Sequence, residues 1–184
     1  MTKFIIGLSG WAQTGKDSVG NVLQKNHEMA QRAFADPMRE SMKKLDPYVN
    51  EEGMRLSDAL IREGGWEWAK KNTDTRRLLQ IYGTDIGRKM FGEDFWVDQA
   101  FKGIEELRQI VFTDTRFPNE AQRVKDSGGT VWRISRPGVE AANDHASEHA
   151  LDDWNFDYHI NNNGTLEELA TQVDNAVARI RRGL

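Results

Sequence analysis

The chain has 184 residues, 38% of them hydrophobic and 29% charged, with a formal net charge of −4 and no cysteine. This length predicts one domain, the composition excludes a collagen-like or low-complexity chain, and the negative balance argues against a nucleic-acid polymer as partner. The missing cysteines exclude disulfides, zinc–thiolate sites and thiol nucleophiles. The apolar run at residues 4–8 is too short for a membrane span and lacks a signal-peptide cleavage region, so we expect a cytoplasmic protein without a membrane partner.

Strands and helices alternate along the chain. Short apolar segments predict five strands, at Phe4 to Ser9, Arg32 to Ala35, Ile110 to Thr113, Thr130 to Ser135 and Tyr158 to Asn161. Helical spacing predicts helices at Lys16 to Ala30, Pro37 to Leu45, Ser57 to Glu63, Thr75 to Met90, Glu93 to Leu107, Pro118 to Ser127 and Thr165 to Arg181. Thr165 and Glu168 predict a capping box at the start of the last helix. This α/β alternation favours a parallel sheet with helices on both faces, whose strands all end at one ligand-binding edge.

A glycine-rich loop follows the first predicted strand. Residues 10–18 read Gly-Trp-Ala-Gln-Thr-Gly-Lys-Asp-Ser, which contains the G-x-x-x-x-G-K part of the Walker A pattern between a strand and a helix. The backbone N–H groups of such a loop surround a phosphate, and Lys16 would reach the β and γ oxygens. Asp17 stands where Ser or Thr ligates Mg²⁺, and Ser18 supplies a hydroxyl one residue later, so both are candidate metal ligands. The candidate ATP-binding residues of the loop are Gly10, Ala12, Gln13, Thr14, Gly15, Lys16, Asp17 and Ser18.

The third predicted strand ends in an acid. Asp114 follows it directly, which is the Walker B arrangement for holding Mg²⁺, although a strand-end Asp also caps helices. Arg116 lies two residues further on and suits phosphate geometry, and Glu120 could orient it by pairing. A lysine, a cation-binding acid and an arginine suffice for phosphoryl transfer, which makes Lys16, Asp17, Asp114 and Arg116 the candidate catalytic residues.

Charged residues follow two further strands. Asp36 and Arg39 come after the second predicted strand, and Arg136 comes after the fourth. We assign Asp36 and Arg39 to the acceptor substrate and Arg136 to ATP. Closure of the polar stretch at about residues 136–155, a lid-like segment, would exclude water from the site.

Several motifs stand together in this chain. They are Gly-Lys-Asp-Ser in the phosphate loop, Phe34-Ala35-Asp36-Pro37, the run from Arg76 to Thr84 with Arg88 and Trp96, the run from Asp114 to Glu120, and late segments at residues 145–148 and 162–169. With these motifs the sequence resembles the bacteriophage deoxynucleoside monophosphate kinases, a branch of the P-loop nucleoside monophosphate kinases, over nearly the whole chain.

The resemblance implies a fold, a reaction and an acceptor site. The fold would be a three-layer P-loop kinase with a five-stranded parallel sheet, one domain over residues 1–184, and a helical acceptor-binding insertion at about residues 37–108. The reaction would be transfer of a phosphoryl group from ATP, with Mg²⁺, to a deoxynucleoside monophosphate. The acceptor site would contain Asp36, Arg39, Arg76, Gln80, Gly83, Thr84, Arg88, Trp96, Arg116 and Glu120.

Other functions stay open at this point. The loop and Asp114 identify the donor better than the acceptor, so a kinase for dephospho-coenzyme A or a sugar acid is an alternative. A nucleotide-binding regulator without turnover ranks lower, because the base-reading signature of GTPases is absent. Residues 145–149 match the H-x-x-E-H zinc-protease pattern, which short sequences meet easily by chance. A homodimer is also left open.

Overall fold

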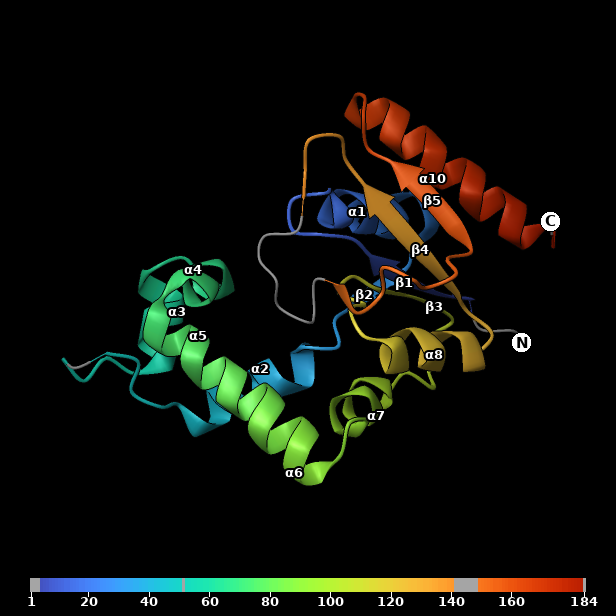
Figure 1. The fold of residues 1–184 in the computed structure, drawn as a ribbon. Helices are drawn as coiled ribbons and strands as arrows, with labels where there is room; N and C mark the ends of the chain where they lie inside the picture. The colour runs from blue at the N-terminus through green and yellow to red at the C-terminus, as the bar shows by residue number, and fades with distance from the viewer. Residues whose placement is uncertain (1–3, 51, 141–148, 184) are drawn as a thin grey trace. The chain divides into compact units, whose positions relative to one another are not determined.

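The computed structural model describes residues 4–50, 52–140 and 149–183 (Figure 1). Its contacts divide the chain into two compact units, the first formed by Met1–Phe34 with Phe101–Leu184 and the second by Ala35–Ala100. Each unit has its own cluster of buried apolar side chains. Among the described helices, none is long and apolar enough to cross a membrane.

A five-stranded parallel sheet forms the centre of the first unit. Its strands are β1 (Phe4–Ser9), β2 (Ala30–Arg32), β3 (Gln109–Phe112), β4 (Thr130–Ser135) and β5 (Tyr158–Asn161). They are hydrogen-bonded in the order β2-β3-β1-β4-β5. The predicted α/β class and the predicted parallel sheet of five strands are therefore confirmed.

Helices cover both faces of this sheet. Ile6 and Leu8 of β1 belong to a buried cluster with residues of α1 (Lys16–His27) and α10 (Leu166–Arg181). Gly7, on the opposite face, lies against Val124 of α8 (Pro118–Asp126). Figure 1 shows α1 and α10 on one face and α8 on the other, as alternation with a period of two along a strand requires.

The second strand differs from its prediction. β2 spans Ala30–Arg32, whereas the apolar pattern predicted Arg32 to Ala35. The ladder with β3 ends at Arg32, and the backbone N–H of Phe34 instead donates to the carboxylate of Asp114. The Asp114 side chain thus replaces the next hydrogen bond between the two strands. The sequence around β2 does not predict this replacement, because Asp114 is far away in the chain.

Two predicted helices end earlier than expected. α1 ends at His27 rather than Ala30, because Glu28 adopts the left-handed conformation with φ 55°. α7 covers Phe95–Phe101 rather than Glu93 to Leu107, and Gly103 soon after it has φ 75°. The capping box predicted for the last helix is confirmed, with both reciprocal bonds between Thr165 and Glu168 present.

The second unit is helical. It contains α2 (Asp36–Leu45), α3 (Leu56–Arg62), α4 (Gly65–Lys71), α5 (Thr73–Gln80), a π-helix (Ile81–Arg88), α6 (Lys89–Phe91) and most of α7. Met42, Val49, Leu56 and Ala59 form its buried cluster, against which aromatic side chains of α4 pack. α4 was not among the predicted helices.

The helix predicted at Thr75 to Met90 is present but not uniform. It starts at Thr73, where the side chain of Asn72 accepts from the N–H of Thr75 and caps the first turn. From Ile81 to Arg88 the backbone widens into a π-helix, in which each N–H binds the carbonyl five residues earlier. π-Helical segments are rare and are often found at functional sites. The segment Ile81–Arg88 is therefore a candidate for a functional region of the second unit.

Candidate active site

The strands of the first unit bring the predicted phosphate loop next to Asp114. Gly7 of β1 pairs in parallel with Phe112 of β3. Beyond the end of β3, the N–H of Thr115 donates to the carbonyl oxygen of Leu8 in β1 at 3.0 Å. The loop that follows β1 and the segment that follows β3 therefore leave the same edge of the sheet side by side.

The backbone of the phosphate loop has an unusual conformation. Gly10, Gln13 and Gly15 have positive φ angles of 152°, 66° and 102°. A Cβ atom at Gly10 would meet the carbonyl oxygen of Ile134, and one at Gly15 would meet the side-chain amide of Asn162. Left-handed residues in a short loop can turn neighbouring N–H groups toward one side, an arrangement that binds anions in phosphate loops. The two glycines of the motif are therefore required by space as well as by conformation.

Lys16 lies over this loop. Its ammonium nitrogen donates to the carbonyl oxygens of Gly10 and Trp11, both at 2.7 Å. Thr14, which is buried, donates from its hydroxyl to the same Trp11 oxygen at 2.9 Å. These bonds fix the lysine and the loop as one unit, with the positive charge at the amino end of α1, where the helix dipole also favours an anion.

The remaining loop residues lie at the surface of the first unit. Ala12, Gln13 and Asp17 are exposed, and Ser18 is half-buried in the first turn of α1. Their side chains are therefore accessible to a ligand.

One neighbour of the loop was not among the predicted site residues. Asn162, directly after β5, donates from its side-chain nitrogen to the carbonyl oxygen of Thr14 at 3.0 Å. The run of three asparagines at the end of a predicted strand was a polar signal at the ligand-binding edge, but nothing local pointed it at the loop.

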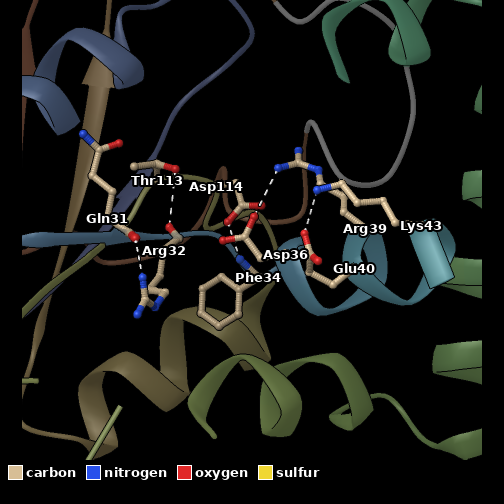
Figure 2. Close-up of polar contacts among 9 residues, drawn as sticks. All are labelled: Gln31, Arg32, Phe34, Asp36, Arg39, Glu40, Lys43, Thr113 and Asp114. Atoms are coloured by element: carbon tan, nitrogen blue, oxygen red, sulfur yellow. Dashed lines mark hydrogen bonds and ion pairs between the residues drawn. The ribbon is translucent and has the colours of Figure 1, made fainter. Parts of the chain in front are cut away.

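Asp114 ties the ends of two strands together. Its Oδ1 accepts from the backbone N–H of Phe34 at 2.7 Å (Figure 2). One residue earlier, the N–H of Thr113 donates to the carbonyl oxygen of Arg32 at 3.0 Å. Asp114 thus has a structural bond at the carboxyl edge of the sheet, and its half-buried carboxylate has a second oxygen besides Oδ1.

Glu120 organises the start of α8. Its carboxylate, in a side chain that is 7% exposed, accepts from the backbone N–H groups of Arg116 at 2.7 Å and Phe117 at 3.1 Å. This satisfies donors that a helix start leaves without partners. Glu120 therefore orients Arg116 through its backbone, whereas the pairing of the two side chains stays a prediction.

The other predicted residues of the first unit are less informative. Arg136 is exposed directly after β4. Residues 141–148, which include most of the zinc-protease pattern and the middle of the lid-like segment, lie outside the described residues. Within residues 4–50, 52–140 and 149–183, no group of three or more His, Asp or Glu side chains could hold a metal ion.

In the second unit, Arg39 lies on α2 between an acid and an aromatic ring. Its guanidinium is 3.4 Å from Oδ1 of Asp36, and its central carbon is 5.9 Å from the ring centre of Trp66 (Figure 2 shows the ion pair). The ammonium of Lys43 is also 5.9 Å from that ring. This face of α2 therefore places two cations, each paired with an acid of the same helix, beside an indole ring.

The π-helix carries other predicted acceptor residues of the second unit. Trp96 donates from its indole N–H to the carbonyl oxygen of Gly83 at 2.8 Å, and its ring fills the place where a Cβ of Gly87 would lie. A Cβ at Gly83 would lie 2.7 Å from the sulfur of Met38. Trp96 therefore packs against the π-helix and bonds to it.

The exposed residues of α5 and the π-helix include Arg76, Gln80 and Thr84, and Arg88 is half-buried.

Comparison with known proteins assigns the family. A family model described as deoxynucleotide monophosphate kinase matches residues 65–173, more than half of the chain. A provisionally named deoxynucleotide monophosphate kinase of Acanthamoeba polyphaga mimivirus is 30% identical, over 94% of this chain and 95% of its own length. The chain belongs to the deoxynucleotide monophosphate kinase family.

Phage proteins of the same name are also similar. The deoxynucleotide monophosphate kinase of Escherichia phage RB69 is 33% identical over 54% of this chain and 43% of its own length, and that of Enterobacteria phage T4 is 32% identical over 55% and 44%. Among solved structures, shikimate kinase from Aquifex aeolicus aligns with a TM-score of 0.48 and 12% identity over 98% of this chain and 99% of its own. Dephospho-CoA kinase from Campylobacter jejuni aligns with a TM-score of 0.48 and 14% identity over 99% and 98%.

The predicted site residues of this kinase fall into two groups, one in each unit. The first unit contains the phosphate loop, Asp114, Arg116, Glu120 and Arg136, and the second contains the remaining candidates for the acceptor. Membership of a kinase family implies ATP as the phosphate donor. The chemistry of the first group fits this donor, because a concave set of backbone N–H groups beside a lysine binds phosphate.

Proposed function

We propose that the kinase transfers the γ-phosphoryl group of ATP to the phosphate of a deoxynucleoside monophosphate and so produces the diphosphate. The observation that supports the proposal is the phosphate loop, whose positive-φ backbone and hydrogen-bonded Lys16 would form an anion site near Asp114. The family assignment supplies the class of acceptor.

The donor's phosphates would bind at the loop. The N–H groups of residues 10–15 and the amino end of α1 would surround the β-phosphate, and Lys16 would exchange its bonds to the Gly10 and Trp11 carbonyls for phosphate oxygens. The carbonyl oxygens of Gly10 and Trp11 would then accept hydrogen bonds from water in place of Lys16. The lysine charge would balance the negative charge of the β and γ oxygens in the transition state.

Mg²⁺ fits the same edge of the sheet. This ion is commonly held by one or two carboxylates together with water and substrate phosphates, so it needs no cluster of three acids. Asp114, Asp17 and Ser18 would hold it, directly or through water. When bound, Mg²⁺ neutralises charge on the phosphates.

Arg116 is the candidate for stabilising the transferred group. Glu120 fixes its backbone through the N–H bond at 2.7 Å, at the turn that leaves β3 beside the phosphate loop. A guanidinium can bind two phosphate oxygens at once and keeps its charge at all physiological pH values. We assign Arg136, which follows β4 on the other side of β1, to the same phosphates.

The second unit would bind the acceptor. Arg39 and Arg76 supply positive charge for a monophosphate, and Gln80 and Thr84 supply exposed hydrogen-bonding groups on one helical stretch. Asp36 would orient Arg39 through the ion pair that the unit already contains. We place Gly83, Arg88 and Trp96 at this acceptor site because the π-helix brings Trp96 against Gly83.

Acceptor-dependent release of ADP tests the proposal. The kinase is incubated with ATP and Mg²⁺ against a panel of deoxynucleoside and ribonucleoside monophosphates. We expect release with at least one deoxynucleoside monophosphate, and release with none of the panel would overturn the assignment.

A matched pair of arginine variants tests the role of Arg116. Arg116→Ala is expected to lower kcat about 10²-fold while changing the Kd of ATP far less, since its charge acts mainly in the transition state. Arg182→Ala, at the exposed carboxyl end of α10, is the control and should keep wild-type turnover. Wild-type turnover in Arg116→Ala would remove this residue from the site.

A further inference from the structure

We propose that Asn162 is a positioning residue that holds the phosphate loop in its anion-binding conformation. The inference rests on the proposed function, in that the loop is taken to bind the donor's phosphates. It adds a residue from the far end of the chain, 148 positions from its partner Thr14.

Asn162 is itself fixed by the sheet. It directly follows β5, and its backbone N–H donates to the carbonyl oxygen of Ser135 at 2.7 Å, which extends the ladder between β4 and β5 by one bond. Its side chain is half-buried and projects to the phosphate loop. The amide therefore extends from a rigid strand end rather than from a mobile loop.

The contact with Thr14 controls the direction of a neighbouring N–H group. The side-chain nitrogen of Asn162 donates to the carbonyl oxygen of Thr14 at 3.0 Å. Because the peptide unit is planar and trans, the Thr14 carbonyl and the Gly15 N–H point in opposite directions. A carbonyl held against Asn162 thus directs the Gly15 N–H away from Asn162.

The same side chain also sets the space around Gly15. This glycine has φ 102°, and a Cβ on it would meet the Asn162 amide. A glycine without contacts in this position could adopt several backbone conformations. Asn162 packs against Gly15 and donates to the preceding carbonyl, which lowers the number of conformations that Gly15 can adopt. Asn162 thereby prepares the turn into α1 for the anion before it arrives.

Two substitutions separate this role from simple packing. Asn162→Asp keeps the shape but replaces the N–H donor with a carboxylate oxygen that repels the Thr14 carbonyl. Asn162→Ala removes both the bond and the contact with Gly15. The flanking exposed residues provide matched controls, Asn161→Ala and Asn163→Ala, since no side-chain bond to the loop is described for either.

Binding of MgADP by calorimetry and the steady-state constants for ATP are measured for each variant, together with the Tm of the free protein. We expect the Asp and Ala variants of Asn162 to bind MgADP about tenfold more weakly and to show a raised KM for ATP, since one oriented hydrogen bond corresponds to about one decade. The Tm of the free protein should stay close to the wild type, and both controls should bind MgADP normally.

Three results would overturn the inference: wild-type MgADP affinity in Asn162→Asp, weakening that only Asn162→Ala shows, or losses that follow a lowered Tm of the free protein. The MgADP arm needs no acceptor. A wild-type protein that binds MgADP but phosphorylates no monophosphate would therefore refute the proposed acceptor, while the response of Asn162→Asp still decides the role of Asn162.

Discussion

Asp114 has a structural bond and a proposed metal-binding role, and two substitutions can separate them. Its Oδ1 accepts from the N–H of Phe34, a residue that is only 3% exposed. Asp114→Asn retains an oxygen that can accept this bond but removes the charge. Asp114→Ala removes both and leaves the Phe34 N–H without this acceptor.

The stabilities of the two variants should therefore differ. A hydrogen bond to a charged group contributes about 1.5–3 kcal/mol, so Asp114→Ala is expected to be destabilised by that amount. For a chain of this size each kcal/mol corresponds to about 2–4 °C, which predicts a Tm lowered by about 3–12 °C. Asp114→Asn exchanges a charged acceptor for a neutral one and should lose about 1 kcal/mol.

Turnover should respond differently from stability. If Asp114 holds Mg²⁺, both variants lose the carboxylate ligand, and kcat should fall about 10²-fold or more in each, with a higher Mg²⁺ requirement. Acceptor-dependent ADP release across a Mg²⁺ titration measures this, and thermal unfolding measures stability. Asp126→Asn, an exposed acid at the end of α8, is the control.

Two outcomes would refute the reasoning. Wild-type turnover and Mg²⁺ dependence in Asp114→Asn would mean that this carboxylate acts only as the acceptor for Phe34. Equal Tm values for the Asn and Ala variants would mean that the bond at 2.7 Å contributes no measurable stability.

The other predictions concern three local contacts. Gly10→Ala places a Cβ against the Ile134 carbonyl at φ 152°, so we expect a loss of about 1–3 kcal/mol and weaker MgADP binding, and wild-type calorimetry would contradict this. Trp96→Phe keeps a ring but leaves the Gly83 carbonyl without the indole N–H, which should lower the free energy of unfolding in urea by about 1–3 kcal/mol. An unchanged urea midpoint would show that this bond is dispensable. Glu120→Ala removes the acceptor for two N–H groups at the start of α8 and should cost about 0.5–2 kcal/mol, whereas Glu120→Gln retains an acceptor and should lose less. Equal Tm values for these two variants would exclude the capping role.

In the second unit, the structure departs from the regular helix that the sequence predicted. Helical spacing predicted one helix from Thr75 to Met90, which contains Arg76, Gln80 and Thr84. The change to a π-helix at Ile81 widens the turn and alters which residues share a face beyond Gln80. The glycines at 83 and 87 leave room for close neighbours: a Cβ at Gly87 would meet the ring of Trp96, and a Cβ at Gly83 would meet the sulfur of Met38.

The sequence by itself determined those features that depend on neighbours along the chain. The phosphate loop is one example, since Gly10, Gly15 and Lys16 lie in one short segment between an apolar strand and a helix. The alternation of strands and helices was sufficient for a five-stranded parallel sheet, because βαβ units place consecutive strand ends at one edge. The position of Asp114 at that edge follows from the same rule.

Only the tertiary structure decided the contacts between segments that are far apart in the chain. The end of β2 depends on the bond from the N–H of Phe34 to Asp114. The phosphate loop is held by a bond from the side-chain amide of Asn162 to the carbonyl oxygen of Thr14. Likewise Glu120 accepts from two backbone N–H groups at the start of α8, a pair of contacts that the sequence did not indicate. The physical reason is common to all three: a carboxylate or amide has several possible partners, and its sequence neighbours do not reveal which of them folding brings within hydrogen-bonding distance.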